Sequence, residues 1–447
     1  MLTYQDLQAV GEGEQERMGF VRKVINEHQG SDLYRTAKIA DDYYRHRNTT
    51  ITQYQKLLYT ISGKAVPDNW SANYKLASNF FKRFVTQQVQ YLLGNGVTWN
   101  GQAADRLGDT FDARLQEAGK YALIGGESFG FYNLDHVEVF NLLEFAPLYD
   151  EENGALAAGV RFWQVDKSKP LRATLYEIDG YTDFIWKYSQ GEILHEKRPY
   201  KINVRYSESD GLEIYDGENY PDFPIVPFWG NQEHQSELVG IREQIDAYDL
   251  IKSGFANDLD DVSQIYWTIS NAGGMDDIDL AQFVQRIKTV KATALQDGQV
   301  AEAHTVTVPV DGREALLDRL RKDLYRDYMA LDTDEISGGA ITATQIRAQY
   351  EPLNSKADEF EYCVTEFIQG ILAVAGVEDE PTYTRSTIVN QSEEIQNLVA
   401  AGEFLPGDYV TERILTLLGD GDKVKEVLAM MSEEETIDFS EDVTDEE

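Results

Sequence analysis

Mostly apolar side chains recur at alternating steps of three and four residues between Ser236 and Thr268. This spacing places them on one side of an α-helix. A helix of that extent would be roughly 45–50 Å long, which few globular enzymes need in mid-chain. The predicted stripe consists of Leu238, Ile241, Ile245, Tyr248, Lys252, Phe255, Leu259, Val262 and Tyr266.

The same spacing predicts two further long helices. One runs from about Arg313 to Leu331, and the other covers residues 342–377 after a capping box of Thr342 and Gln345. Pro352 lies inside the second of these helices, where proline removes a backbone donor and clashes with the preceding turn, so we predict a kink near 348–352. The shorter helix presents Leu317, Leu320, Leu324, Tyr328 and Leu331 on one face.

The rest of the chain divides into a helical beginning, a β-rich middle and a helical end. Helical spacing predicts three helices in the first part of the chain: Asp6–His28, Ala72–Leu93 and Ala103–Ile124. The first of them is polar enough to lie on the surface. Alternating runs separated by Asn-Gly, Asp-Gly and Gln-Gly turns predict a β-meander over residues 127–229. Between the first two long helices, the mixture of helical and alternating patterns over residues 271–310 predicts a small α/β insert. The fold class is therefore α+β and mostly helical.

Charge and cysteine content narrow the classes of protein. The chain has 78 acidic and 40 basic residues, a net charge of −38, so it is not expected to grip nucleic acid through its overall field. Cys363 is the single cysteine and is expected to be a small core residue. No signal peptide or long apolar run is visible, which indicates a soluble protein. Residues 432–447 form an acidic tail that is predicted to be disordered.

The sequence carries no recognisable catalytic motif. The glycines from Gly125 to Gly130 have the spacing of a phosphate loop, but the Lys and Ser/Thr that should follow are absent, so a helix–strand turn is favoured. The six histidines form no pair at metal-ligand spacing. Acidic clusters at residues 258–261 and 276–279 lack the pattern of a calcium loop. The sequence therefore predicts no metal, no cofactor and no catalytic residues, although carboxylate pairs for an acidic polysaccharide hydrolase remain available.

The order of these parts resembles the portal proteins of tailed double-stranded DNA bacteriophages, in the branch of long-tailed phages of Gram-positive hosts. Three stretches carry the resemblance: a helix that ends in Tyr91-Leu-Leu-Gly, a central block from Ile225-Val-Pro-Phe through Ser253-Gly-Phe-Ala-Asn-Asp-Leu, and Gly402-Glu-Phe-Leu-Pro-Gly-Asp-Tyr-Val-Thr near the acidic tail. Single motifs are moderately specific, whereas their order and spacing together are strong.

The resemblance implies a ring, usually of twelve subunits, at one capsid vertex. By position it implies a wing (1–235), a first stem helix (236–270), a clip (271–310), a second stem helix (311–331), a tunnel loop (332–341), a kinked wing helix (342–377) and a crown (378–431). Such a ring forms when each subunit binds the next through two different surfaces and the rotation from one subunit to the next adds up to a full turn.

The same resemblance assigns candidate residues to three surfaces. The tunnel loop, beside the DNA channel, contains Asp332, Asp334, Glu335, Ser337, Gly338 and Gly339 and no base, so we expect its carboxylates to repel DNA. Stem packing is assigned to Leu238, Ile241, Ile245, Tyr248, Phe255, Leu259, Val262, Leu317, Leu320 and Leu324. Clip docking is assigned to Asp276, Asp277, Gln282, Arg286 and Lys288, and the helix kink to Pro352.

The implied partners are further copies of the chain, double-stranded DNA passing without sequence specificity, the terminase large subunit, a head–tail connector, and capsid and scaffold proteins, but no membrane. The implied location is the virion, and the host cytoplasm during assembly. Two other functions stay open from the residues alone: an acidic polysaccharide hydrolase, and another virion adaptor or minor head protein.

Overall fold

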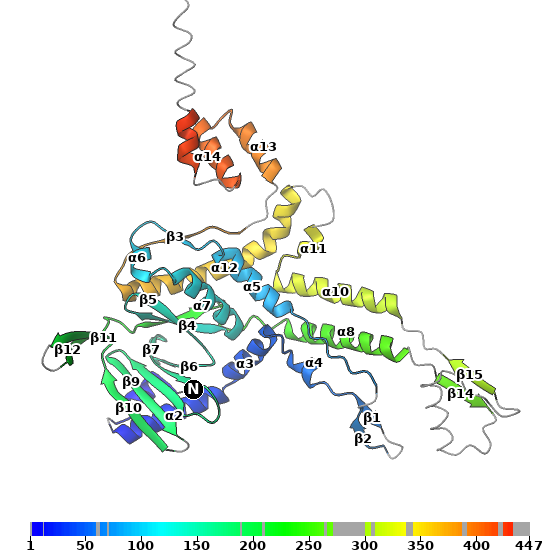
Figure 1. Ribbon diagram of the computed structural model, residues 1–447, viewed down its shortest axis with the longest axis horizontal. Helices are drawn as coiled ribbons and strands as arrows, with labels where there is room; N and C mark the ends of the chain where they lie inside the picture. The colour runs from blue at the N-terminus through cyan, green and yellow to red at the C-terminus, as the bar shows by residue number, and fades with distance from the viewer. Residues whose placement is uncertain are drawn as a thin grey trace, which may run out of the picture.

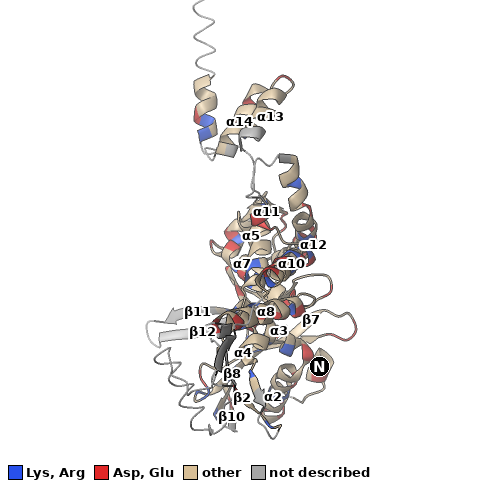
Figure 2. Cartoon of the chain, turned by 90° about the vertical axis from the view of Figure 1, so that its right-hand side faces the viewer, with Lys and Arg blue, Asp and Glu red and all other residues tan. Residues whose placement is uncertain are grey.

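The computed structural model describes residues 2–11, 13–59, 63–68, 71–187, 190–207, 211–262, 266–270, 300–304, 309–336, 343–386, 391–418 and 423–431 (Figure 1). The chain is α+β, as predicted. A mixed body carries two long helices that run out to one side, and the C-terminal helices stand apart from the body in both whole-chain views (Figures 1 and 2).

The N-terminal part is mainly helical, with differences from the predicted bounds. Its elements are α1 (Tyr4–Gln8), α2 (Glu14–Gly30), α3 (Asp32–Tyr44), α4 (Thr49–Gln53), β1 (Leu57–Tyr59), β2 (Ala65–Pro67), α5 (Phe80–Leu93), β3 (Val97–Trp99), α6 (Ala103–Leu107) and α7 (Phe111–Gly125). The helix predicted from Ala72 begins only at Phe80. The helix predicted over 103–124 is interrupted at Gly108, whose φ of +79° fits glycine.

Helix α2 lies on the surface, as its polar composition suggested, and most of its residues are exposed. One of its faces is buried against β6, β7 and β10. Phe20, Val21, Val24 and Ile25 form that face, at the spacing of one helical side. A narrow apolar stripe was therefore enough to dock a mostly polar helix.

The predicted β-rich middle is present, but it forms three sheets. Strands β6 (Phe145–Tyr149), β7 (Leu156–Trp163), β8 (Leu171–Glu177), β9 (Gly180–Lys187) and β10 (Gln190–Arg198) form an antiparallel meander in chain order. Strand β13 (Ile225–Trp229) instead returns to β4 (Glu127–Asn133), which also pairs with β5 (His136–Asn141). Strands β11 (Lys201–Ser207) and β12 (Gly211–Glu218) pair as a separate hairpin.

The two long helices α8 (Arg242–Val262) and α10 (Val310–Tyr328) pack side by side and antiparallel. Gln244 Nε2 donates to Asp327 at 2.6 Å near one end, and Arg313 pairs with Asp258 at 2.6 Å near the other. Helix α8 is shorter than predicted at both ends, because residues 237–241 form turns and Tyr266 lies in a strand. Strand β14 (Tyr266–Ser270) pairs with β15 (Val300–His304) beyond the far ends of both helices (Figure 1).

The chain returns across the body after α10. Short α11 (Thr333–Ile336) precedes α12 (Ala343–Ala375), which packs on α5, β4 and β13. Strand β16 (Pro381–Tyr383) then pairs with β3, so the first residues of the segment assigned to the crown, 379–386, are bound to the body. The crown itself stays a prediction. Helices α13 (Gln391–Ala401) and α14 (Gly407–Leu418) follow, and residues 424–431 are also helical.

The main core lies where α12 crosses the three-stranded sheet. Phe228 of β13 stacks on Phe367 of α12 with ring centroids 4.7 Å apart. Gly130 of β4 faces the same ring, and a Cβ atom there would lie 2.4 Å from Phe367. Glycine is therefore favoured at this position, because the Phe367 ring packs directly on the strand and leaves no room for a side chain.

Candidate functional site

The candidate site is the segment Leu331–Ile336, which we call the loop root because it leads from α10 into the predicted tunnel loop. Helix α10 ends at Met329 in the left-handed conformation, with φ of +64°. The Ala330 N–H then bonds to the Tyr325 carbonyl at 2.9 Å and reverses the chain. The loop root consequently folds back against α10 and α5, and its last four residues form α11.

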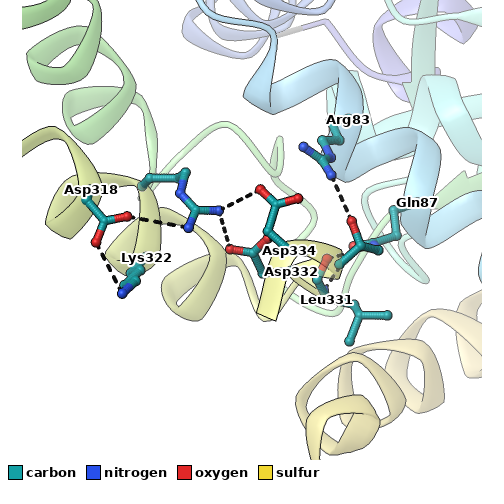
Figure 3. Close-up of polar contacts among 9 residues, drawn as sticks. Arg83, Gln87, Asp318, Lys322, Leu331, Asp332 and Asp334 are labelled. Atoms are coloured by element: carbon teal, nitrogen blue, oxygen red, sulfur yellow. Dashed lines mark hydrogen bonds and ion pairs between the residues drawn. The ribbon is translucent and has the colours of Figure 1, made fainter. Parts of the chain in front are cut away.

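Asp332 and Asp334 both accept hydrogen bonds from Arg321 of α10 (Figure 3). Arg321 Nη1 lies 2.6 Å from Asp332 Oδ2 and 3.2 Å from Asp334 Oδ2. Asp332 is only 8% exposed, and its Oδ1 accepts the Asp334 N–H at 3.2 Å. Asp332 therefore caps α11 with one oxygen and binds a cation with the other.

Arg321 sits among three carboxylates. A third contact joins it to Asp318 at 3.5 Å. Partial burial lowers the pKa of the Arg321 guanidinium, but the charges of Asp332, Asp318 and Asp334 outweigh that effect and raise the pKa. Arg321 thus stays cationic and offsets part of the negative charge of the loop root.

This pairing bears on one sequence-based expectation. The tunnel loop has no base of its own, and its carboxylates were expected to repel DNA, which stays a prediction. The structure adds that Asp332 and Asp334 are paired with Arg321, which the chain reversal brings beside them from α10. No local sequence signal links the pair. The side chain of Glu335, together with Ser337, Gly338 and Gly339, lies outside the described residues.

A polar stripe on α5 holds the loop root from the other side. We call Arg83, Gln87 and Tyr91 the α5 stripe, because steps of four residues place them on one helix face. The Gln87 amide makes two bonds to the Leu331 backbone, each 3.0 Å: Nε2 donates to the carbonyl and Oε1 accepts the N–H. Arg83 Nη2 donates to Thr333 Oγ1 at 3.2 Å. The loop root is thus fixed by α5 and α10 together (Figure 3).

The predicted stem residues are only partly buried in the single chain. Leu238, Ile241, Ile245 and Leu324 are buried, and Tyr248, Phe255, Leu317 and Leu320 are half-buried. Leu259 is 48% exposed, and the side chain of Val262 is outside the described set. The predicted apolar stripe therefore packs within the chain mainly at the body end of α8.

Further along α8, a polar stripe replaces the apolar one. Asp249, Ser253 and Asn257 are buried at steps of four residues. They accept the backbone N–H groups of Ser78, Leu76 and Tyr74 at 2.8, 2.9 and 2.6 Å. Four helical residues advance roughly 6 Å and two extended residues roughly 6.6–6.8 Å, so alternate amides of an extended segment match this stripe.

Asp249 is the most enclosed member of this polar stripe. The Asn48 amide also donates to it, at 2.5 Å. Burial raises the pKa of Asp249, and the bonds from Asn48 and Ser78 oppose the rise. The predicted helix over 72–79 is thus replaced by an extended segment whose backbone is satisfied by side chains of α8.

The remaining predicted sites have mixed outcomes. Gly126 ends α7 at φ of +90° and β4 follows directly, so the glycine run is a helix–strand turn, as predicted. Cys363 is buried, as predicted. Pro352 lies within α12, whose yellow first turns run in a different direction from its orange remainder in Figure 1; proline as the cause stays a prediction. The clip residues Asp276, Asp277, Gln282, Arg286 and Lys288 lie outside the described residues.

Within the ranges that the structure describes, no group of three or more His, Cys, Asp or Glu side chains is arranged to hold a metal ion. None of the described helices combines the length and apolar composition that a membrane span requires. The interactions that the candidate site does show are ion pairs from Arg321 and hydrogen bonds from the Gln87 amide, which hold the loop root in position.

Comparison with known proteins gives consistent matches. Residues 23–437 match the family described as phage portal protein, SPP1 Gp6-like. The portal protein of Clostridium phage phiCD119 is 24% identical over 361 residues, covering 72% of this chain and 77% of that protein. The portal protein of Bacillus phage SPP1 is 26% identical over 423 residues, covering 85% and 79%. One solved structure, described as the neck of an empty GTA particle computed with C6 symmetry, is 12% identical with a TM-score of 0.44, covering 76% of this chain and 90% of that one.

Proposed function

The chain belongs to the family of phage portal proteins of the SPP1 Gp6 type, and from this premise we propose that its copies form a ring at one capsid vertex, through which double-stranded DNA enters and leaves. The ring is expected to hold twelve subunits. The proposed role is that of a conduit and docking platform, with ATP hydrolysis supplied by a separate terminase.

The observation that carries this proposal is the antiparallel pair α8 and α10. The pair connects the body to β14 and β15 at one end and to the loop root at the other (Figure 1). Contacts at both ends fix the two helices to each other. A ring of such pairs would form the wall of a tube, with the loop at its inner end and the insert at its outer end.

The exposed apolar residues of the C-terminal helices support assembly with further copies. Of the residues over 391–431 whose side chains are described, only Val410 is buried. Figure 2 draws most of α13 and α14 as uncharged. Apolar surface without a core of its own favours burial against a neighbour. The exposed side chains are Val399, Phe404, Leu405, Tyr409, Leu418, Met430 and Met431.

We still propose that the channel binds DNA only weakly, but we attribute this to the charge of the whole chain and not to the loop carboxylates alone. Arg321 offsets charge at Asp332 and Asp334, so these two residues do not act as free repelling groups. The net charge of −38 per chain still disfavours tight binding of phosphate. We therefore assign repulsion to the overall acidic surface, and to the loop root the task of positioning the loop.

The insert between β14 and β15 is proposed as the docking surface. In the assembled particle it would contact the terminase large subunit and later a head–tail connector, while capsid and scaffold proteins would surround the body. These assignments rest on family membership and on the position of β14 and β15 beyond the paired helices.

The test has two arms on the full-length chain. Native mass measurement should give a closed ring, a multiple of the 50.7 kDa chain, and particle images should show an axial channel. In the encoding phage, a stop codon in this gene should give capsids without DNA, and the intact chain supplied in trans should restore packaging. A monomer that releases sugars from a polysaccharide would contradict the proposal and support the hydrolase.

A further inference from the structure

Tyr91, the last member of the α5 stripe, contacts two segments that are far apart in the sequence. Its hydroxyl donates to Asn354 Oδ1 of α12 at 2.5 Å, and its ring stacks on Tyr350 with centroids 5.7 Å apart. Its backbone carbonyl accepts the Ser386 N–H at 2.9 Å. One residue of α5 therefore joins α12, beside Pro352, to the segment that leads into the C-terminal helices.

That leading segment, residues 379–386, which we call the linker, is held along its length. Strand β16 pairs with β3, and Asp379 accepts the N–H groups of Gly101 and Ala103 at 3.0 and 3.1 Å. At the other end, Arg385 donates to Asp358 at 2.5 Å and to Glu361 at 2.7 Å on α12. The linker is thus fixed to the body immediately before the C-terminal helices begin.

A small hydrophobic cluster joins these contacts to the loop root. Its members are Tyr91, Leu331, Tyr350, Leu353 and Ala357, and it is separate from the main core. Leu331 is the first residue of the loop root, and Gln87, one turn before Tyr91, holds its backbone. Three segments that otherwise pack elsewhere therefore meet at one joint: the linker, the Pro352 region of α12 and the loop root.

We propose that Tyr91 and Arg385 are positioning residues that couple the C-terminal helices to the loop root. A displacement of the linker would move Arg385 and its partners on α12, and the Tyr91 cluster would transmit this change to Leu331. Close packing supports such transmission, because packed side chains have few alternative arrangements. The inference rests on the proposed function only in that the loop after this root lines the channel.

Hydrogen exchange of the full-length chain tests the coupling without DNA or terminase. Arg385→Gln removes the ion pairs of the linker and should speed exchange of 379–386. If the joint transmits the change, exchange of 331–336 should also accelerate, by about twofold or more, as expected for couplings of roughly 0.5–2 kcal/mol. Arg319→Gln is the matched control, since Arg319 is 69% exposed on α10 and pairs with Asp323.

The reciprocal experiment makes the test specific. Coupling between sites acts in both directions, so Gln87→Ala, which cuts the bonds to Leu331, should speed exchange of the Ser386 amide. Tyr91→Phe keeps the ring and removes only the hydroxyl, so it should show a milder effect at both segments. Acceleration confined to 379–386 in Arg385→Gln would overturn the inference. Ring formation and DNA packaging are measured in separate experiments. If either of them fails, the hydrogen-exchange result still shows whether the linker and the loop root are coupled.

Discussion

Glu127 begins β4 directly after the Gly126 turn and is buried. Its Oε1 accepts a hydrogen bond from the Tyr149 hydroxyl. Burial raises the pKa of the Glu127 carboxyl well above its ordinary value. An acid whose pKa is raised by folding stabilises the fold fully below its unfolded pKa and loses that contribution as the pH rises through the folded pKa.

We therefore predict that Glu127→Gln removes this pH dependence. Glutamine keeps the acceptor for Tyr149 and has no charge to bury. The melting temperature of the variant minus that of the native chain should therefore increase as the pH is raised from about 5 to about 8. Glu196→Gln, at an exposed position on β10, is the control and should show no such trend. A constant difference across this range would contradict the assignment of Glu127 as a buried acid.

Single residues were predictable where the chemistry is local. The Gly126 turn follows from the glycines between a helical and an alternating pattern, and the burial of Cys363 follows from the tendency of a free cysteine to behave as a small core residue. Asp332 was not predictable in this way. Its partner Arg321 approaches only because α10 ends in a left-handed residue and the chain reverses, and a list of loop residues contains neither fact.

At the scale of elements, apolar periodicity predicted which segments are helical and missed what polar stripes do. Helix α5 carries the predicted apolar face, including Phe81, Phe84 and Val85, while its Arg83, Gln87 and Tyr91 bind the loop root and the linker. Helix α8 was predicted too long, because the apolar stripe was followed into turns at one end and into strand β14 at the other, and past Ile245 the buried side chains on this helix are polar. In the sequence, buried polar side chains of this kind cannot be told from the exposed polar face of a helix, because their backbone partners are not visible there.

The polar stripe of α8 gives an element-scale prediction. Asp249→Ala should leave the Ser78 N–H and the Asn48 amide without their acceptor, at a cost of about 1–3 kcal/mol for each buried group. Ser253→Ala should release only the Leu76 N–H and cost less. Amide exchange over 72–79 measures both effects, with Glu243→Gln, exposed on the same helix, as the control. Unchanged exchange in Asp249→Ala would show that the extended segment is held by other contacts.

At the scale of the whole molecule, periodicity and charge alone left several functions open. The order and spacing of three stretches pointed to a portal protein, and the match over residues 23–437 confirms the family. The apolar pattern alone did not predict assembly. Only the fold shows that apolar residues over 391–431 are left exposed by the part of the chain that the structure describes.

Two opposing forces should then set the assembly of rings. Copies that each carry a net charge of −38 repel one another, and salt screens this repulsion, with a Debye length of about 8 Å at physiological ionic strength. Raising the salt concentration from a low value should therefore increase the fraction of rings in native mass measurements. Burial of exposed apolar surface between copies opposes this repulsion and stabilises the ring, by about 25 cal/mol for each Å² of apolar area buried.

Phe404 separates the two forces, because it is 85% exposed between α13 and α14. Phe404→Glu removes apolar area and adds a negative charge, so it should lower the ring fraction at every salt concentration. Phe404→Ala removes the area alone and should lower it by an amount that salt does not restore. Val165→Glu adds the same charge at an apolar position that is 86% exposed between β7 and β8, so it should cause only the part of the loss that salt reverses. Equal effects of Phe404→Glu and Val165→Glu would show that repulsion alone controls assembly.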